Sequence, residues 1–262
     1  MADPLDAFAA FARLLAATAR RETLPASRGG STIAENKVAD GFDPVTQSDR
    51  NSERAMRRLI EENFPDHGIS GEEFPDRPGS GRWCWSLDPI DGTRAYICGL
   101  PSWTTLIALL EEGEPVLGVV DVPRLDELYV GYRGEALLTC AGAQEPLVTS
   151  GCRSIGEARL STTDPYLFAG AEAEGFERLR RTARLTRYGL DAYAYARLAA
   201  GSLDLVAESG LKPHAYNALV PLVRAAGGAV SNWSGGADLR AGQIVAAATQ
   251  ELLDQACRLL SG

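Results

Sequence analysis

The sequence predicts a layered α/β sandwich built from two closely packed halves. Its 262 residues are enough for one large domain or for two halves that share a substantial core. Between residues 104 and 139, short apolar runs alternate with turn signals, a pattern typical of an antiparallel meander. After about residue 150, strand and helix patterns alternate, which indicates helices layered on a sheet. We therefore expect an N-terminal α+β half over residues 1–150 and a C-terminal α/β half over residues 151–262.

The first half begins with two predicted helices. In residues 1–22 the apolar side chains recur at helical spacing, at Leu5, Phe8, Phe11 and Leu15. A long polar stretch rich in Gly and Pro follows, and a second amphipathic helix over residues 46–64 ends before Pro65. A strand is then expected over residues 83–88, and the strands of the meander over residues 104–110, 115–123, 127–132 and 133–139.

The second half is predicted to alternate between strands and helices as far as its last residues. The expected strands cover residues 158–162, 203–208 and 244–249. The expected helices cover residues 176–182, 191–201, 217–228 and 251–260. The composition changes only gradually near residue 150, which favours a division between packed halves over a linker.

The composition argues against several classes of function. Nucleic-acid binders usually have a strongly basic surface, whereas this chain has a formal net charge of −9. The five cysteines are scattered and odd in number, which indicates reduced thiols in a cytoplasmic protein. The first residues have neither the charge order of a signal peptide nor the apolar length of a membrane span. We expect no nucleic-acid or membrane partner.

Acidic residues cluster at three places before the meander. Asp49 follows Thr46 at the spacing of a helix capping box, which is one explanation for it and leaves room for a second role. The adjacent acids Glu72 and Glu73 could simply belong to a solvated turn. Asp88 and Asp91 flank a stiff Pro-Ile pair at the edge of an apolar run, where two carboxylates repel each other and are costly to desolvate. Oxygen ligands without a nearby His or Cys favour a hard cation, Mg²⁺ first, which would remove that repulsion.

Together these segments resemble the inositol monophosphatase superfamily of Mg²⁺-dependent phosphatases. The resemblance rests on "GEEF", "LDPIDGT" and the upstream "NK…DPVTQSD", in the right order and at matching spacing, and it runs through almost the whole chain. It implies the αβαβα sandwich of the sugar phosphatases, a homodimer and two or three Mg²⁺ ions, with Mn²⁺ as a substitute. The substrate it implies is a small phosphate ester.

The resemblance also implies roles for individual residues. The metal ligands would be Glu72, Asp88, Asp91 and the carbonyl of Ile90. Glu72 and Thr93 would orient the attacking water, and the amides of Gly92 and Thr93 would receive phosphate oxygens. Lys37 and Asp49 would steady the site from behind the ligands.

The second half is similar to the histidinol-phosphate phosphatase branch, which hydrolyses L-histidinol phosphate in histidine biosynthesis. The similarity lies in "RYGLDAYAYARLAAGSLDLVAESGLKP" and "ALVPLVRAAGG". It implies that Arg187, Asp191 and Glu208 shape the pocket for the organic part of the substrate. Two acids there suit a cationic amino alcohol better than a neutral polyol, an argument from charge alone.

The sequence departs from the family at Ala215, where the family has an aspartate that binds the second metal. Its neighbour His214 is expected to be a residue of the pocket wall rather than a replacement ligand. The chain is either a natural relative with a weakened or repurposed site, or it carries an Asp→Ala substitution that slows turnover. The intact motifs elsewhere favour the second explanation. Inositol monophosphate or another small ester is the alternative substrate, and a non-catalytic relative that binds phosphate esters is the alternative function.

Overall fold

The computed structural model describes residues 4–27, 34–36 and 44–262. A seven-stranded sheet occupies the first half of the chain, in the order β3-β4-β5-β6-β7-β8-β9. β3 runs parallel to β4, and every later neighbour in this sheet is antiparallel. Its strands are β3 (Gly68–Gly71), β4 (Trp83–Asp91), β5 (Thr104–Glu111), β6 (Glu114–Val122), β7 (Glu127–Tyr132), β8 (Glu135–Cys140) and β9 (Ala143–Pro146).

A five-stranded mixed sheet forms the centre of the second half, in the order β11-β10-β12-β14-β13. β10 pairs in parallel with both of its neighbours, whereas β14 pairs antiparallel with β12 and β13. The strands are β10 (Arg159–Thr162), β11 (Leu185–Tyr188), β12 (Leu205–Glu208), β13 (Ala229–Ser231) and β14 (Ile244–Ala247). A separate small ladder joins β1 (Ala34–Asn36) to β2 (Pro44–Thr46).

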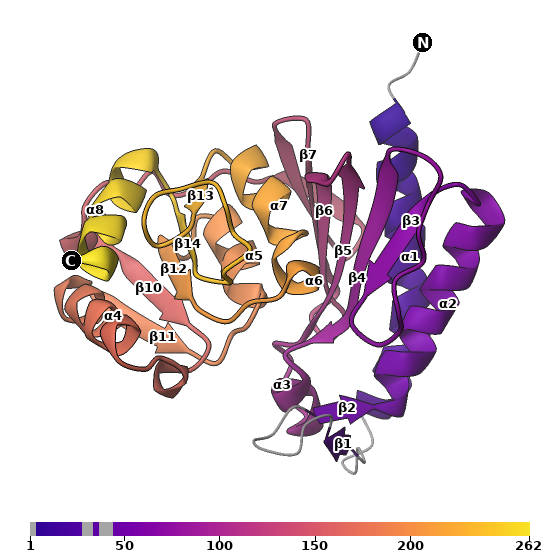
Figure 1. The fold of residues 1–262 in the computed structure, drawn as a ribbon, viewed down its shortest axis with the longest axis horizontal. Helices are drawn as coiled ribbons and strands as arrows, with labels where there is room; N and C mark the ends of the chain where they lie inside the picture. Colours follow the sequence, from indigo (N-terminus) through magenta and orange to yellow (C-terminus); the bar gives the residue numbers. More distant parts are fainter. Residues whose placement is uncertain (1–3, 28–33, 37–43) are drawn as a thin grey trace.

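The helices make three layers around the two sheets, as Figure 1 shows. One outer layer packs on the seven-stranded sheet, the middle layer lies between the sheets, and the other outer layer packs on the five-stranded sheet. The layers consist of α1 (Pro4–Ser27) and α2 (Gln47–Asn63); α5 (Tyr193–Ala199), α6 (Pro213–Tyr216) and α7 (Leu219–Ala225); and α4 (Ala171–Thr182) and α8 (Gln250–Ser261). The predicted αβαβα sandwich is confirmed.

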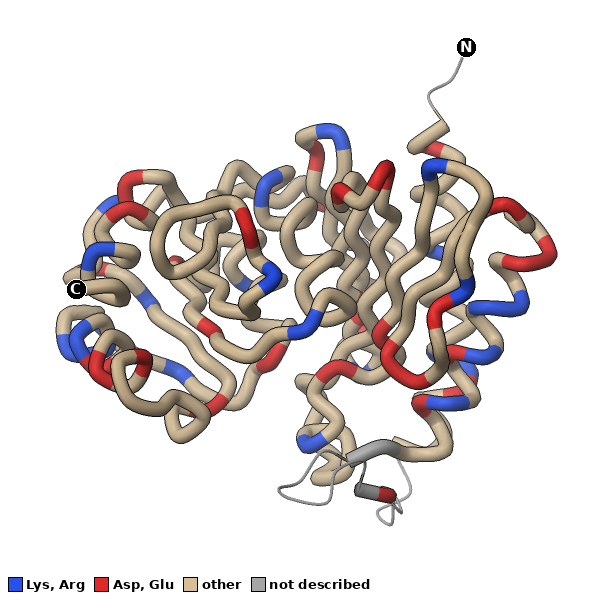
Figure 2. The backbone as a smooth tube through the Cα atoms, viewed as in Figure 1, with Lys and Arg blue, Asp and Glu red and all other residues tan. Residues whose placement is uncertain are grey.

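Apolar cores fill the space between the layers, and one of them spans the middle helical layer and reaches both sheets. Phe8, Met56 and Trp85 belong to the core between the first helices and the first sheet. Leu106 and Leu222 belong to the core of the middle layer. Helices α2 and α4 contain charged residues of both signs (Figure 2), as helices with one apolar face do. None of the described helices has the length and apolarity needed to cross a membrane.

The structure adds elements that the sequence patterns did not predict. Helix α1 continues to Ser27, beyond the expected end at residue 22. The short elements β3, β9, β11, β13, α3 (Thr93–Ile97) and α6, and the 3-10 turns η1 (Ile155–Glu157) and η2 (Pro165–Leu167), were not expected as separate elements. An element of three to five residues is too short to show a periodic pattern, so its neighbours decide its conformation. The boundary at residue 150 remains an interpretation.

Candidate metal centre

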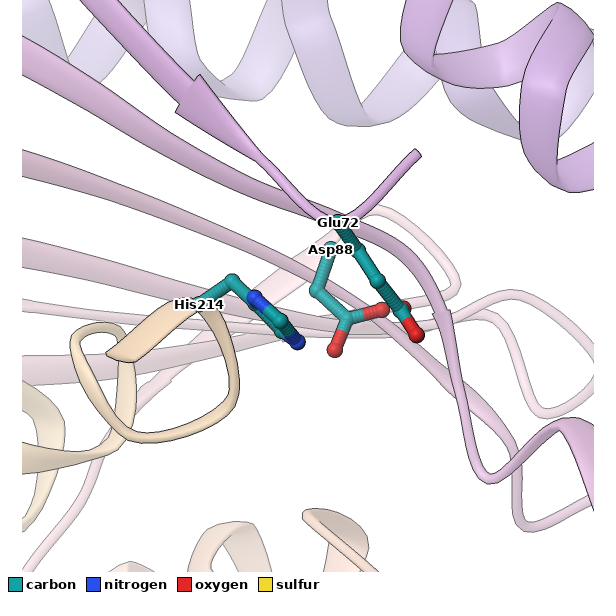
Figure 3. Close-up of side chains that lie close together, drawn as sticks. All are labelled: Glu72, Asp88 and His214. Atoms are coloured by element: carbon teal, nitrogen blue, oxygen red, sulfur yellow. The ribbon is translucent and has the colours of Figure 1, made fainter. Parts of the chain in front are cut away.

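Three side chains from distant segments converge at the edge of the first sheet, as Figure 3 shows. Glu72 follows β3, Asp88 lies in β4, and His214 lies in α6. One ligand atom from each of the three lies within 4.8 Å of the others. β3 and β4 pair in parallel, and the Glu72 amide donates to the Leu87 carbonyl at 3.3 Å, so Glu72 and Asp88 are held side by side. His214, which we expected to belong to the pocket wall, approaches them from the middle helical layer.

Asp88 is the most deeply buried member of the group, with 3% of its surface exposed. Its Oδ1 has no hydrogen-bond partner among the described residues. Burial raises the pKa of Asp88 well above its usual value, and the nearby carboxylates of Glu72 and Asp91 raise it further. A buried oxygen without a partner is unfavourable unless something else binds it, and a cation would supply what is missing.

Asp91 lies at the other end of the same motif and makes different contacts. The register of β4 on β5 shifts between Asp88 and Asp91, as in a β-bulge. Residues three apart on a regular strand point to opposite faces, so an extra residue between them turns both acids toward one side. Asp91 Oδ2 accepts hydrogen bonds from the Ala192 amide at 2.8 Å and from Thr104 Oγ1 at 3.4 Å. Burial, followed by the charge of Asp191, raises the pKa of Asp91 to about 8.

Asp49 lies in the first turn of α2. It forms the predicted capping box, in which its Oδ2 accepts from the Thr46 amide at 2.8 Å. Burial raises the pKa of Asp49 to about 6 against the hydrogen bonds from Thr46, and the charge of Glu72 adds to the rise. Asp49 is therefore near enough to Glu72 to influence it. Lys37 lies outside the described residues.

Helix α2 also holds the segment that carries Glu72, through two residues that the sequence analysis did not single out. Glu53 is fully buried, and its Oε2 accepts from the Glu73 amide at 2.8 Å. A β carbon on Gly71 would overlap the Glu53 carboxylate, so this close approach requires glycine. Arg57 pairs with Glu53 at 2.7 Å and donates to the carbonyls of the following segment. The i,i+4 spacing of these two charges was the available signal.

The Gly92–Thr93 turn closes the motif. Gly92 has φ of 78°, and a β carbon there would lie 3.0 Å from Asp191 Oδ2, so glycine meets both a backbone and a space requirement. Thr93 Oγ1 donates to the Ile90 carbonyl at 3.0 Å. The side chain of Ile90 is buried in a small core with Tyr96 and Trp103, which anchors that carbonyl.

An acidic cavity of about 170 Å³ adjoins the motif. Asp91, Asp191, Glu208, Tyr195 and Ala215 are among the residues that line it. Burial, followed by the charge of Asp191, raises the pKa of Glu208 to about 8, although Glu208 accepts a hydrogen bond from the Thr163 amide at 2.7 Å. Burial also raises the pKa of Asp191, against the opposing charge of Arg94.

Two further positions from the sequence analysis, a predicted pocket residue and the position of the missing metal ligand, differ from these acids. Arg187 is exposed on the edge strand β11 and does not line this cavity. Ala215 does line it, and its methyl group offers no ligand atom. A larger cavity of about 750 Å³ lies along α4 and shares Thr163 with the acidic one.

Comparison with known proteins gives a consistent picture. Residues 4–261 match the family model described as the inositol monophosphatase family. A chloroplastic bifunctional phosphatase of Arabidopsis thaliana is 42% identical over 198 residues, which cover 75% of this chain and 56% of that protein. A histidinol-phosphatase of Mycobacterium tuberculosis is 33% identical over 236 residues, covering 88% of this chain and 90% of the relative. The structure of an inositol monophosphatase from Zymomonas mobilis superposes with a TM-score of 0.87 at 36% identity, covering 100% of both chains.

Proposed function

Since the chain belongs to the inositol monophosphatase family of phosphatases, we propose that it is a Mg²⁺-dependent phosphomonoesterase that hydrolyses L-histidinol phosphate to L-histidinol and phosphate. The observation that carries the phosphatase assignment is the buried Asp88 oxygen without a partner, beside Glu72 and the Gly92–Thr93 turn. From the resemblance we also propose a homodimer in the cytoplasm.

The residues present fit Mg²⁺. Glu72, Asp88, Asp91 and the Ile90 carbonyl are oxygen donors, and Mg²⁺ is commonly held by a few carboxylates while water and substrate phosphate complete its shell. When bound, such ions lower the pKa of a bound water and neutralise the phosphate. They would also offset the burial and the repulsion that together raise the pKa values of Asp88 and Asp91.

The protein's own groups would position the reactants. We propose that Glu72 and Thr93 orient the attacking water, with Asp49 steadying Glu72. The amides of Gly92 and Thr93, at the start of α3, would receive phosphate oxygens. Thr93 already donates to the Ile90 carbonyl, so its hydroxyl is held in one direction.

The substrate preference is proposed from the charge of the cavity. Asp191 and Glu208 both line it beside Asp91, and burial, followed by the charge of Asp191, raises the pKa of Glu208. A substrate that brings its own cation offsets the repulsion among these acids, so the amino group of histidinol phosphate suits the cavity better than the hydroxyls of inositol phosphate. Arg187 is exposed outside this cavity, so we propose no contact for it within a single chain.

Two alternatives remain tied to particular observations. Inositol monophosphate is the alternative substrate, because the Zymomonas mobilis structure with a TM-score of 0.87 is that of an inositol monophosphatase. A non-catalytic relative that binds phosphate esters is the alternative function, because Ala215 stands where the resemblance implies a carboxylate ligand.

The test is phosphate release from L-histidinol phosphate and from inositol 1-phosphate, with Mg²⁺ or with EDTA, by this chain and by Ala215→Asp. Asp191→Asn should raise KM for histidinol phosphate much more than for inositol phosphate, because only the first substrate loses an ionic partner. The exposed Asp238→Asn is the matched control. Equal KM changes for both substrates would contradict the proposed preference, and release that is unaffected by EDTA would contradict the metal dependence.

A further inference from the structure

His214 lies where a ligand of a metal ion would lie. Its ring, Glu72 and Asp88 each present an atom within 4.8 Å of the other two, and Figure 3 shows the three side chains directed toward one another. Ligand atoms of one cation lie about 3 to 4 Å apart. If the three ligand atoms moved about 1 Å closer together, all three could therefore bind one ion.

A second observation points to a ligand at the same place. Asp88 is 3% exposed, and its Oδ1 has no hydrogen-bond partner among residues 4–27, 34–36 and 44–262. Asp88 is also held rigidly, because it lies in β4 and pairs with Leu106 of β5. A rigid buried oxygen without a donor, next to an imidazole and a second carboxylate, has the composition of a cation site.

The position of α6 brings the imidazole to the acids. The helix begins at Pro213 and packs against β4, the strand that carries Asp88. Ala215, the residue after His214, faces the acidic cavity and provides no donor atom. His214 is thus the residue of α6 that the structure places with the carboxylates.

We propose that His214 is a direct metal ligand, and that Glu72, Asp88 and His214 bind a first-row transition cation such as Mn²⁺ or Zn²⁺ in preference to Mg²⁺. Imidazole nitrogen is a good ligand for the transition metals, whereas Mg²⁺ prefers oxygen. Asp88 would then bind both this cation and Mg²⁺, and the Ile90 carbonyl and Asp91 would remain oxygen ligands of Mg²⁺. This inference rests on the proposed function, since it concerns one ion of the same metal centre.

The test uses the fact that the chain has only two histidines. His67 is the internal control, because it is buried at the far end of β3, where its Nδ1 accepts from Trp85 Nε1 at 3.1 Å. Tag-free protein labelled with ¹⁵N-histidine is titrated with Zn²⁺, and with Mg²⁺ separately, while the ring nitrogens are followed by NMR. Zn²⁺ should move one ring nitrogen of His214 strongly and leave His67 in place, whereas Mg²⁺ should move neither comparably.

Variants give a second, independent reading. His214→Gln assigns the NMR signal, and it should weaken Zn²⁺ binding in calorimetry by at least about 100-fold while changing Mg²⁺ binding little. His67→Gln, which keeps an acceptor for Trp85, should leave Zn²⁺ affinity unchanged. Melting curves in EDTA establish that both variants are folded, and the titration of the unaltered chain stands whatever their behaviour.

Either of two results would overturn the assignment: a His214 nitrogen that stays in place while Zn²⁺ saturates the protein, or equal Zn²⁺ affinity with and without the imidazole. Phosphate release from histidinol phosphate is measured on the same samples and tests the proposed function separately. The nitrogen signal reports on His214 whether or not the ester is hydrolysed.

Discussion

Ala215 is buried at the wall of the acidic cavity, next to His214, and its side chain ends in a methyl group. If the leaving oxygen of the substrate depends on a cation held there, a carboxylate at position 215 should restore the binding of that cation. We expect Ala215→Asp to raise kcat for histidinol phosphate by about 100-fold or more, with KM changing comparatively little. Steady-state kinetics with saturating Mg²⁺ measure this, and an unchanged kcat would show that position 215 does not limit turnover.

Asp91 is a second residue whose charge can be changed with little change of shape. In Asp91→Asn the side-chain carbonyl can still accept from the Ala192 amide, so the fold should survive. The variant loses the charge that would hold Mg²⁺, and the activity should fall by about 100-fold or more. The rise in Tm that Mg²⁺ produces should shrink as well.

The exposed acid Asp238 serves again as the control for this change. Asp238→Asn should keep both the activity and the Mg²⁺ response. An Asp91→Asn protein that kept the full Mg²⁺ response would remove Asp91 from the metal centre.

At the scale of the elements, α2 holds the turn after β3 through the Glu53–Arg57 pair. Arg57→Ala would leave Glu53 buried and without its cation, which typically costs about 3 to 5 kcal/mol. We expect the free energy of unfolding, measured by urea denaturation, to fall by roughly that amount. The phosphatase activity should fall as well, because the segment that carries Glu72 loses its anchor.

Arg58 offers a matched control one residue away. Its pair with Glu62 is exposed, with 81% of the Arg58 side chain accessible. Arg58→Ala should therefore change the unfolding free energy by less than about 1 kcal/mol. Similar losses in both variants would mean that the buried Glu53–Arg57 pair contributes no more than an exposed i,i+4 pair, since alanine has a higher helix propensity than arginine.

The short strands and helices could not be predicted from the sequence because of their length. The meander and the long helices contain enough residues to display their period, so their existence follows from the pattern of apolar side chains. β11 contains four residues in the sequence "LTRY", which carries no such period. It is a strand because β10 pairs with it along its whole length.

Over the whole molecule, the buried acids make metal-free stability depend on pH. Asp91 and Glu208 have pKa values raised to about 8, and Asp49 has one raised to about 6, all above the values of unfolded carboxyls. At these groups the folded state therefore binds protons more tightly than the unfolded state, so the stability that they contribute is greatest at low pH and is lost as pH rises through these values.

We expect the free energy of unfolding in EDTA to fall by at least about 2 kcal/mol between pH 5 and pH 8.5, with a Tm lower by several degrees. Saturating Mg²⁺ should raise Tm, and by more at the higher pH, because it replaces the protons. Thermal melts across this range with and without Mg²⁺ measure both effects. A Tm that does not respond to Mg²⁺ at pH 8 would be evidence against a metal site in this cleft.

Several features of this protein were determined by its sequence alone. The order and spacing of "GEEF" and "LDPIDGT" predicted the family, and the apolar periods predicted the layered sandwich, because both are local properties of the chain. The capping box at Asp49 was predictable for the same reason, since its two partners are three residues apart.

Only the tertiary structure decided what lies beside these motifs. The β-bulge that turns Asp88 and Asp91 to one side arises from pairing with β5, and the approach of His214 to Glu72 arises from the packing of α6 on β4. The partners in these contacts are distant in sequence, and no local period encodes which ring will face which carboxylate. That choice is made when the layers pack, because the buried oxygen of Asp88 must face whatever the opposite layer places against it.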